Sequence, residues 1–239
     1  SDDSVFLDYT IDQFEAVAPG RSIYLVSTST PKKIKNSNKI VACESNSEQY
    51  KLIINRFLDF DAVILHSLTT EKAQIVNNST KNVNFVWMMW GADGFYLKEF
   101  DGKWYSEKTK KIVSNPKEQT LKAKIKKTLR NTKLYNLLYL LRKGKSPSNI
   151  EKVKAIKRIQ FLAPIIEEDF TIIKEKFRLK ELQYVPYSHG SIETLITDIK
   201  KRNNFYTPKE NRILLGNSAD PSNNHIDIIY LLKELNFAG

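Results

Sequence analysis

The stretch AVILHSLTTEKAQIVNNSTKNVNFVWM, residues 62–88, decides the fold class of this chain. Two continuous apolar runs, Ala62–His66 and Val83–Met88, flank a segment with helical spacing, Thr69–Asn77. Continuous rather than alternating apolar strands, joined by a helix, are typical of a parallel sheet that is covered on both faces. The stretch therefore predicts an α/β domain with a Rossmann-like parallel sheet and helices on both faces.

The same alternation continues on both sides of this stretch. Further strands are expected over residues 23–26, 39–43, 158–162 and 182–185, and further helices over residues 48–60, 151–157 and 167–177. The first element is different, because residues 6–17 have helical spacing and precede the first strand. An α/β domain normally begins with a strand, so this order is unusual.

Composition sets limits on the class of protein. The chain has 239 residues with 41% apolar and 11% aromatic side chains, enough to bury a substantial core. The single cysteine, Cys43, excludes an intrachain disulfide framework and fits a reducing compartment. No apolar run approaches the length of a membrane span, and the N-terminus lacks the pattern of a signal peptide. We therefore expect a cytoplasmic protein.

Positive charge is concentrated in one segment. The net charge is +11, and Lys117–Lys145 contains ten basic residues and one acidic residue, Glu118. Leucines recur there at helical spacing, with lysines and arginines between them. Such a helix can be a solvated face, or it can contact an anionic membrane surface or nucleic acid. The leucines favour membrane contact, because nucleic-acid binding predicts more exposed aromatic residues among the basic ones.

Ligands of parallel α/β sheets lie beyond the carboxyl ends of the strands, and two such ends carry reactive side chains. His66 ends one apolar run, and Trp90-Gly91-Ala92-Asp93 follows another. His66 is either a hydrogen-bonded structural residue or a general base. Trp90 can be a core residue, and Asp93 can be a turn former or a helix cap.

The C-terminal stretch NRILLGNSADPSNNHIDIIYLL, residues 211–232, predicts a strand, a polar turn and a helix. Asp220 suits a helix N-cap and Pro221 suits the first helical turn. A turn that ends in a helix N-terminus offers backbone N–H groups and a positive dipole to an anion. Most such turns in α/β proteins bind no ligand, so residue chemistry alone leaves phosphate binding open here.

Two motifs together are more specific. The string GNSADPSNNHI, residues 216–226, resembles the GNS-[GA]-D-x-SN-x-H motif of the TDP-N-acetylfucosamine:lipid II N-acetylfucosaminyltransferase (4-alpha-L-fucosyltransferase) family. The upstream WMMWGADGFY, residues 87–96, is similar to a W-G-x-D-x-Y element of the same family. Met88, Met89 and Ala92 depart from the commoner pattern there. The two matches occur in the order expected for that family.

The resemblance implies an inverting GT-B glycosyltransferase. Such an enzyme would transfer a 4-acetamido-4,6-dideoxyhexose or similar sugar from a TDP-sugar to an undecaprenyl-diphosphate-linked acceptor, in bacterial surface polysaccharide synthesis. It would work as a peripheral protein on the inner face of the plasma membrane, held by Lys117–Lys145. Apart from the TDP-sugar donor it needs no cofactor, and the sequence has no His/Cys cluster that suggests a metal.

The resemblance also assigns roles to residues. His66 or Asp93 would be the catalytic base, and Trp90, Gly91 and Tyr96 would line the acceptor side. Independently of the resemblance, Tyr187 or His189 could face the same acceptor side from the loop that follows the strand expected over residues 182–185. The donor diphosphate would meet the turn near the C-terminus, at Gly216, Asn217, Ser218, Asp220, Ser222, Asn223 and His225.

The same comparison predicts the domain organisation. Residues 1–200 would form the acceptor-side Rossmann-like domain with a basic helical insertion over about 106–157, residues 201–210 a linker, and residues 211–239 the first βα unit of a donor-binding domain. Members of the family begin with a short apolar strand, so we expect this chain to lack a few N-terminal residues. Without the rest of the second domain it would be inactive alone. The competing predictions are a basic nucleic-acid-binding protein, which we disfavour, and a non-catalytic membrane-surface domain.

Overall fold

A computed structural model describes residues 1–80, 82–100, 105–113, 132–143, 147–188, 190 and 223–235. The described chain divides into two units, Ser1–Gly94 with Ser148–Lys201, and Phe95–Pro147 with Arg202–Gly239. The first unit is an α/β unit with parallel sheets, as the sequence predicted. The segment that leaves this unit, Phe95–Pro147, differs at both ends from the insertion expected over about 106–157.

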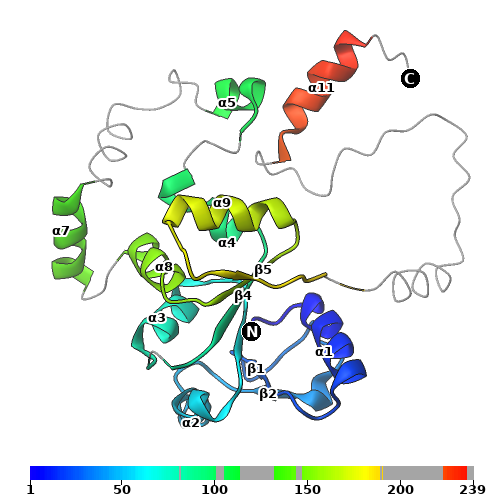
Figure 1. The fold of residues 1–239 in the computed structure, drawn as a ribbon, viewed down its shortest axis with the longest axis vertical. Coiled ribbons are helices and arrows are strands. Elements are labelled where there is room, and N and C mark those ends of the chain that lie inside the picture. The colour runs from blue at the N-terminus through cyan, green and yellow to red at the C-terminus, as the bar shows by residue number, and fades with distance from the viewer. Residues whose placement is uncertain are drawn as a thin grey trace, which may run out of the picture. The chain divides into compact units, whose positions relative to one another are not determined.

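Helices and strands of the first unit mostly alternate along the chain (Figure 1). In order they are α1 (Val5–Val17), β1 (Tyr24–Val26), β2 (Ile40–Ala42), α2 (Glu48–Asn55), β3 (Val63–His66), α3 (Thr70–Asn78), β4 (Phe85–Met89), α4 (Ala92–Phe95, whose last residue belongs to the second unit), α8 (Ser148–Ile156), β5 (Phe161–Pro164), α9 (Glu167–Phe177) and β6 (Gln183–Tyr184). The second unit contains α5 (Glu107–Val113), α7 (Lys133–Lys143) and α11 (His225–Glu234).

The strands form two sheets. β1 pairs with β2, and the larger sheet has the order β3-β4-β5-β6, with every pair parallel. The registers place His66 opposite Met88 and Met89 opposite Pro164, so the carboxyl ends of β3, β4 and β5 lie at one edge of the larger sheet. That edge is where a parallel α/β sheet binds its ligands.

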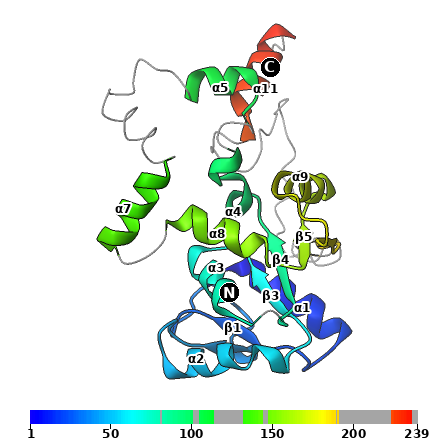
Figure 2. The same cartoon turned by 60° about the vertical axis from the view of Figure 1, so that its left-hand side comes forward.

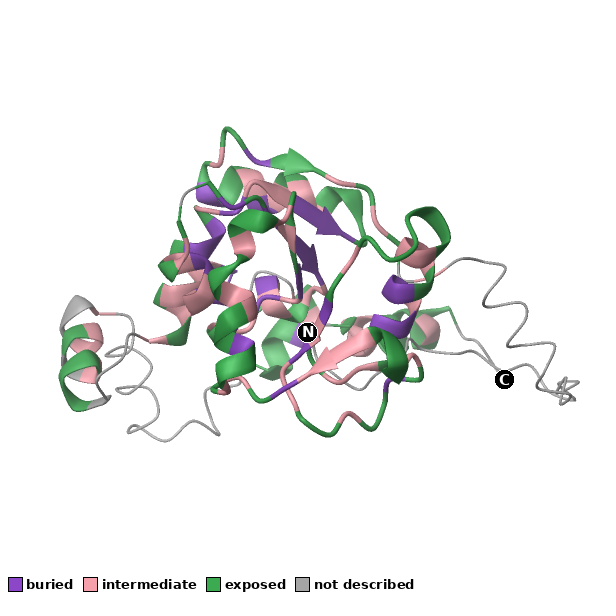
Figure 3. Ribbon diagram, turned by 90° about the horizontal axis from the view of Figure 1, so that it is seen from below, coloured by how far each residue is buried: buried purple, intermediate pink, exposed green. Residues whose placement is uncertain are grey.

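Helices cover the larger sheet and complete the core. α3 and α8 pack side by side, and α9 packs against β5 (Figure 2). Buried residues concentrate in the middle strands, while the edge strand β6 is exposed (Figure 3). Trp87 and Phe85 are among the largest fully buried side chains, which explains the continuous apolar run of β4. A small core joins α1 to β1 through Leu7, Ile11 and Val26, and Ile40 of β2 packs against it.

Local capping explains where the helices begin. The side chains of Ser4, Ser47 and Thr69 accept hydrogen bonds from backbone N–H groups in the first turns of α1, α2 and α3. The helix expected over residues 48–60 is shorter than predicted. Arg56 N–H bonds to the carbonyl of Ile53, three residues back, which tightens the last turn and ends α2 before a 3₁₀ turn at Phe57–Asp59.

The core contains a tyrosine whose ionisation is suppressed. Burial, with a smaller contribution from the charge of Glu71, raises the pKa of Tyr50 to about 12. The pKa of Tyr50 in the folded state lies above that of an unfolded tyrosine, about 10. The neutral phenol therefore contributes its full stabilisation below about pH 10, and this contribution is lost as the pH rises through about 12.

We therefore expect the free energy of unfolding to fall less between roughly pH 9 and 11 in Tyr50→Phe than in the parent chain, because the variant cannot ionise at this position. Urea denaturation at several pH values measures the two slopes. Tyr184→Phe, which removes an exposed hydroxyl, is the control. Identical slopes for the parent chain and Tyr50→Phe would contradict the raised pKa.

Candidate functional site

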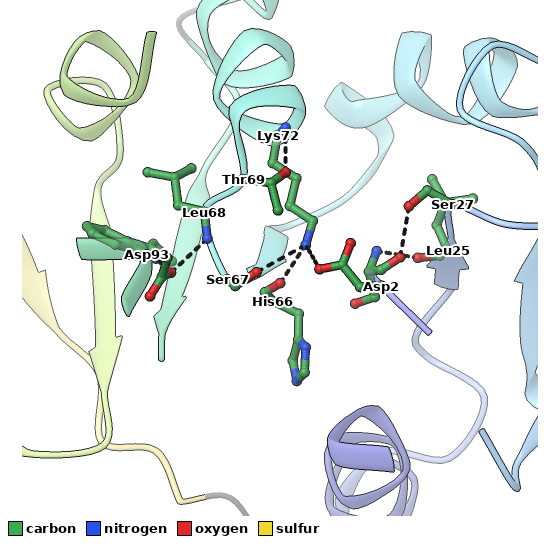
Figure 4. Close-up of polar contacts among 11 residues, drawn as sticks. Asp2, Leu25, Ser27, His66, Ser67, Leu68, Thr69, Lys72 and Asp93 are labelled. Atoms are coloured by element: carbon green, nitrogen blue, oxygen red, sulfur yellow. Dashed lines mark hydrogen bonds and ion pairs between the residues drawn. The ribbon is translucent and has the colours of Figure 1, made fainter. Parts of the chain in front are cut away.

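The Asp93 carboxylate joins the carboxyl ends of β3 and β4. One oxygen accepts hydrogen bonds from Leu68 N–H (Figure 4) and from Trp87 Nε1–H, both at 2.7 Å. The other accepts from Trp90 N–H at 2.9 Å. Gly91 permits this turn, because its φ of 92° lies in a region that favours glycine. Three donors fix the carboxylate in place, so Asp93 positions the two loops that follow the strands.

His66 lies at the same edge, within a cluster of aromatic and hydroxyl groups. Its side chain is 5% exposed, and its ring packs edge-on against Trp90 with ring centroids 4.7 Å apart. Its Nε2 lies 3.5 Å from Thr10 Oγ1, which in turn lies 3.0 Å from the Tyr187 hydroxyl. The structure therefore brings together His66, Trp90 and Tyr187, which the sequence had placed on three separate segments.

The environment of Tyr187 favours its neutral form. Burial raises the pKa of the phenol, and the hydrogen bond with Thr10 lowers it by a smaller amount. Tyr187 thus retains its proton at neutral pH and can exchange hydrogen bonds with Thr10 next to His66. This arrangement supplies an imidazole and two hydroxyls within one small region.

A buried lysine completes the polar edge. Lys72 Nζ lies 2.6 Å from the His66 carbonyl oxygen, 3.1 Å from Asp2 Oδ2 and 3.5 Å from Ser67 Oγ (Figure 4). Ser67 has a φ of 64°, a left-handed conformation that is uncommon for a residue other than glycine. Such conformations cluster at functional sites, which directs attention to the β3–α3 loop.

A cavity of about 380 Å³ lies beside this edge. Thr10, His66 and Lys72 line part of it, and residues of β1 and β3 form much of its wall. A second cavity, of about 530 Å³, is lined by residues of α2 and α3 and contains none of the residues that the sequence singled out.

Charge near the site comes from one further lysine. Burial lowers the pKa of Lys152 on α8, and the Asp93 carboxylate acts in the opposite direction. Among the residues that the structure describes, no three His, Cys, Asp or Glu side chains are grouped as metal ligands. The described site therefore consists of an imidazole, hydroxyls, two carboxylates and ammonium groups.

The remaining predicted residues belong to the second unit or lie outside the described ranges. Tyr96 belongs to the second unit, where it is 57% exposed. Asn223 and His225 also belong to that unit, and His225 opens α11. Gly216, Asn217, Ser218, Asp220 and Ser222 of the donor-side turn lie outside the described residues, as does His189.

The start of α11 corrects one prediction. The helix begins at His225 and its N-cap is Asn224, so neither Asp220 as N-cap nor Pro221 as first-turn residue describes this helix. Asn224 has a φ of 54°, which breaks the helical path, and its side-chain oxygen accepts a hydrogen bond from Ser106 N–H at 2.7 Å. The adjacent α5 is held by Asp227, whose carboxylate accepts from the backbone N–H groups of residues 108 and 109.

Sequence reasoning missed Asp2, Thr10 and Lys72. Lys72 carried a signal, since it lies four residues before Val76 and so shares the buried face of α3. Charged residues on helices are usually solvated, which hides this signal. Thr10 and Asp2 carry no motif, and only the folded arrangement brings them to the site.

No protein-family model matches this sequence, and no curated protein or solved structure matches it significantly. The function must therefore be argued from the site and the motifs themselves.

Replacement of Asp93 by asparagine tests its positioning role. The carboxylate of Asp93 accepts from three N–H groups, whereas the amide of asparagine has an NH₂ donor in place of one oxygen. We therefore expect Asp93→Asn to lower the free energy of unfolding by about 1–3 kcal/mol. Urea denaturation measures the change, and Asp61→Asn at an exposed position is the matched control. Equal effects of the two substitutions would show that the three hydrogen bonds do not hold the site.

Proposed function

We propose that this chain contains the acceptor-side domain of an inverting glycosyltransferase. The reaction would move a 4-acetamido-4,6-dideoxyhexose or similar sugar from a TDP-sugar to an undecaprenyl-diphosphate-linked acceptor. The observation that carries the proposal is the contact between Trp90 of the W-G-x-D element and the His66 ring, 4.7 Å between ring centroids, at the carboxyl edge of a parallel sheet. The motif at residues 216–226 is the second support.

The chemistry assigns different roles to the two base candidates. As the acceptor hydroxyl forms a bond to the anomeric carbon and the bond to the diphosphate breaks, a base must take the hydroxyl proton. We assign this role to His66, because a neutral imidazole can accept a proton near neutral pH. Asp93 is a positioning residue, since its carboxylate already accepts three hydrogen bonds from the protein.

Trp90 and Tyr187 would contact the acceptor around this base. An aromatic face packs against the apolar face of a sugar ring, and a hydroxyl gives it orientation. The departing diphosphate would be stabilised by N–H groups and side chains of the donor-side turn, of which Asn223 and His225 are described. This part of the proposal rests on the motif resemblance.

The exposed leucines of α7 support the proposed contact with an anionic membrane surface. Leu137, Leu140 and Leu141 are 53%, 43% and 74% exposed and lie at helical spacing on a helix that also carries Arg142. Exposed leucines beside basic residues are typical of helices that lie in a membrane interface. None of the described helices has the length and apolarity that a membrane-spanning helix needs.

Acceptor binding tests the proposed function. The ligand is a short-chain isoprenyl-diphosphate-linked N-acetylhexosamine, and binding is measured by calorimetry. We expect Trp90→Ala to weaken binding by about tenfold, while Tyr184→Ala on the exposed strand β6 leaves it unchanged. Unchanged affinity of Trp90→Ala, or selective binding of nucleic acid in place of the acceptor, would contradict the proposal.

A separate experiment addresses α7. We expect the chain to bind vesicles that contain anionic lipid, and Leu137→Ser with Leu141→Ser to reduce this binding by about tenfold or more, because the apolar contact is lost. Cosedimentation with vesicles measures both. Exposed leucines elsewhere, replaced as Leu52→Ser and Leu58→Ser, provide the matched control. Equal losses for both pairs would assign membrane contact to general hydrophobicity and not to α7.

A further inference from the structure

The two sheets of the first unit each leave a strand with one unpaired edge. In the described part of the chain, β1 pairs only with β2 and β3 only with β4. Val63 N–H and Ser67 N–H bond to β4 and its flank, so the N–H and C=O groups of Ile64 face the opposite edge. An open edge of a parallel strand is unusual inside a domain, because its backbone groups need partners.

The backbone at Ser1 already forms part of a parallel ladder on β1. Ser1 N donates to the Leu25 carbonyl oxygen at 2.6 Å, and Ser27 N–H donates to the Ser1 carbonyl oxygen at 3.0 Å. Two bonds that enclose Val26 in this way define a parallel pair. The backbone at Ser1 therefore lies beside the carboxyl end of β1 and runs in the same direction.

The cavity of about 380 Å³ lies between these two edges. Its wall includes Tyr24 and Leu25 of β1, Val63–His66 of β3, and Ser1. Apolar side chains from the surrounding helices complete it, among them Leu7 and Phe14 of α1 and Tyr50 and Ile53 of α2. A space that lies between two parallel edges and is lined mostly by apolar residues can accept a further β-strand.

We propose that this cavity is a strand site, occupied by one extended apolar segment that runs parallel to β1 and joins the backbone at Ser1. A segment of about five residues matches the usual strand length. It would unite the two sheets into one parallel sheet in the order β2, β1, inserted strand, β3, β4, β5, β6. The occupant is a segment connected to Ser1, because Ser1 already has the register and direction of that strand.

The inserted strand would place the polar edge at a reversal of the strand order. In the united sheet the chain proceeds from the inserted strand to β1 on one side, whereas β3 and β4 follow on the other. The strand order therefore reverses between the inserted strand and β3, and ligands of doubly wound sheets bind outside such a reversal. Asp2, His66, Ser67 and Lys72 lie at that point (Figure 4). The strand site stands independently of the proposed sugar transfer.

The test is a chain extended ahead of Ser1 by five apolar residues, Val-Ile-Leu-Val-Ile. The matched control has proline in place of the central leucine, since proline cannot donate to the ladder and is excluded from central strands. We expect the apolar extension to raise the melting temperature and to slow hydrogen exchange of the Leu25 and Ile64 amides by about tenfold or more. The proline-containing extension is expected to do neither.

Three outcomes would overturn the proposal. Unchanged exchange of the Leu25 and Ile64 amides in the apolar chain would show that no strand enters the cavity. Equal protection by both extensions would assign the effect to non-specific collapse of an apolar tail. Protection by the free pentapeptide but not by the attached one would assign the site to a separate partner. Close amide contacts between the extension and Leu25, observed by NMR, would establish the register where aggregation obscures the melting temperature.

Discussion

The Asp93 carboxylate accepts three hydrogen bonds, and these link the loops that follow two neighbouring strands. Leu68 follows β3 and Trp90 follows β4, so both loops converge on one side chain. The third donor, the Trp87 indole, comes from within β4 and ties the loops to the buried core. The positions of His66 and Trp90 depend on this link, because each lies within two residues of a loop that Asp93 holds. In the proposed reaction, Asp93 is therefore the positioning residue and His66 the base.

The buried ammonium group of Lys72 also stabilises this edge. Lys72 contacts the carbonyl of His66 and the carboxylate of Asp2, so one cation joins the end of β3 to the segment before α1. Burial of a lysine is costly unless acceptors surround it, and here three oxygens lie within 3.5 Å. The site thus depends on two opposite charges, since Asp93 accepts from Trp90 N–H and Lys72 donates to the His66 carbonyl. Both charges orient the groups at the edge and neither needs to react.

Much of the fold could be predicted from the sequence, because the buried strands are largely apolar runs and α1, α2 and α3 begin after residues whose side chains cap them. The end of α2 was misplaced, since a 3₁₀ turn and an α-helix have similar hydrophobic patterns. The division into two sheets could not be predicted, because hydrophobic patterns do not say which strands pair. His66 and Trp90 were predicted from their places at strand ends, whereas Lys72 was hidden by the usual exposure of charged residues. Residues 211–222, which carry most of the donor-side motif, lie outside the described chain.

We propose that the edge formed by the ends of β3 and β4 binds the acceptor. Amide chemical shifts, followed by NMR during titration with the isoprenyl-diphosphate-linked sugar, test it most directly. The largest changes should occur in the loops at residues 66–69 and 90–93 and at Thr10, with α9 and β6 unaffected. Changes confined to α7, or spread evenly over the basic residues, would contradict a site at this edge and would indicate binding by charge alone.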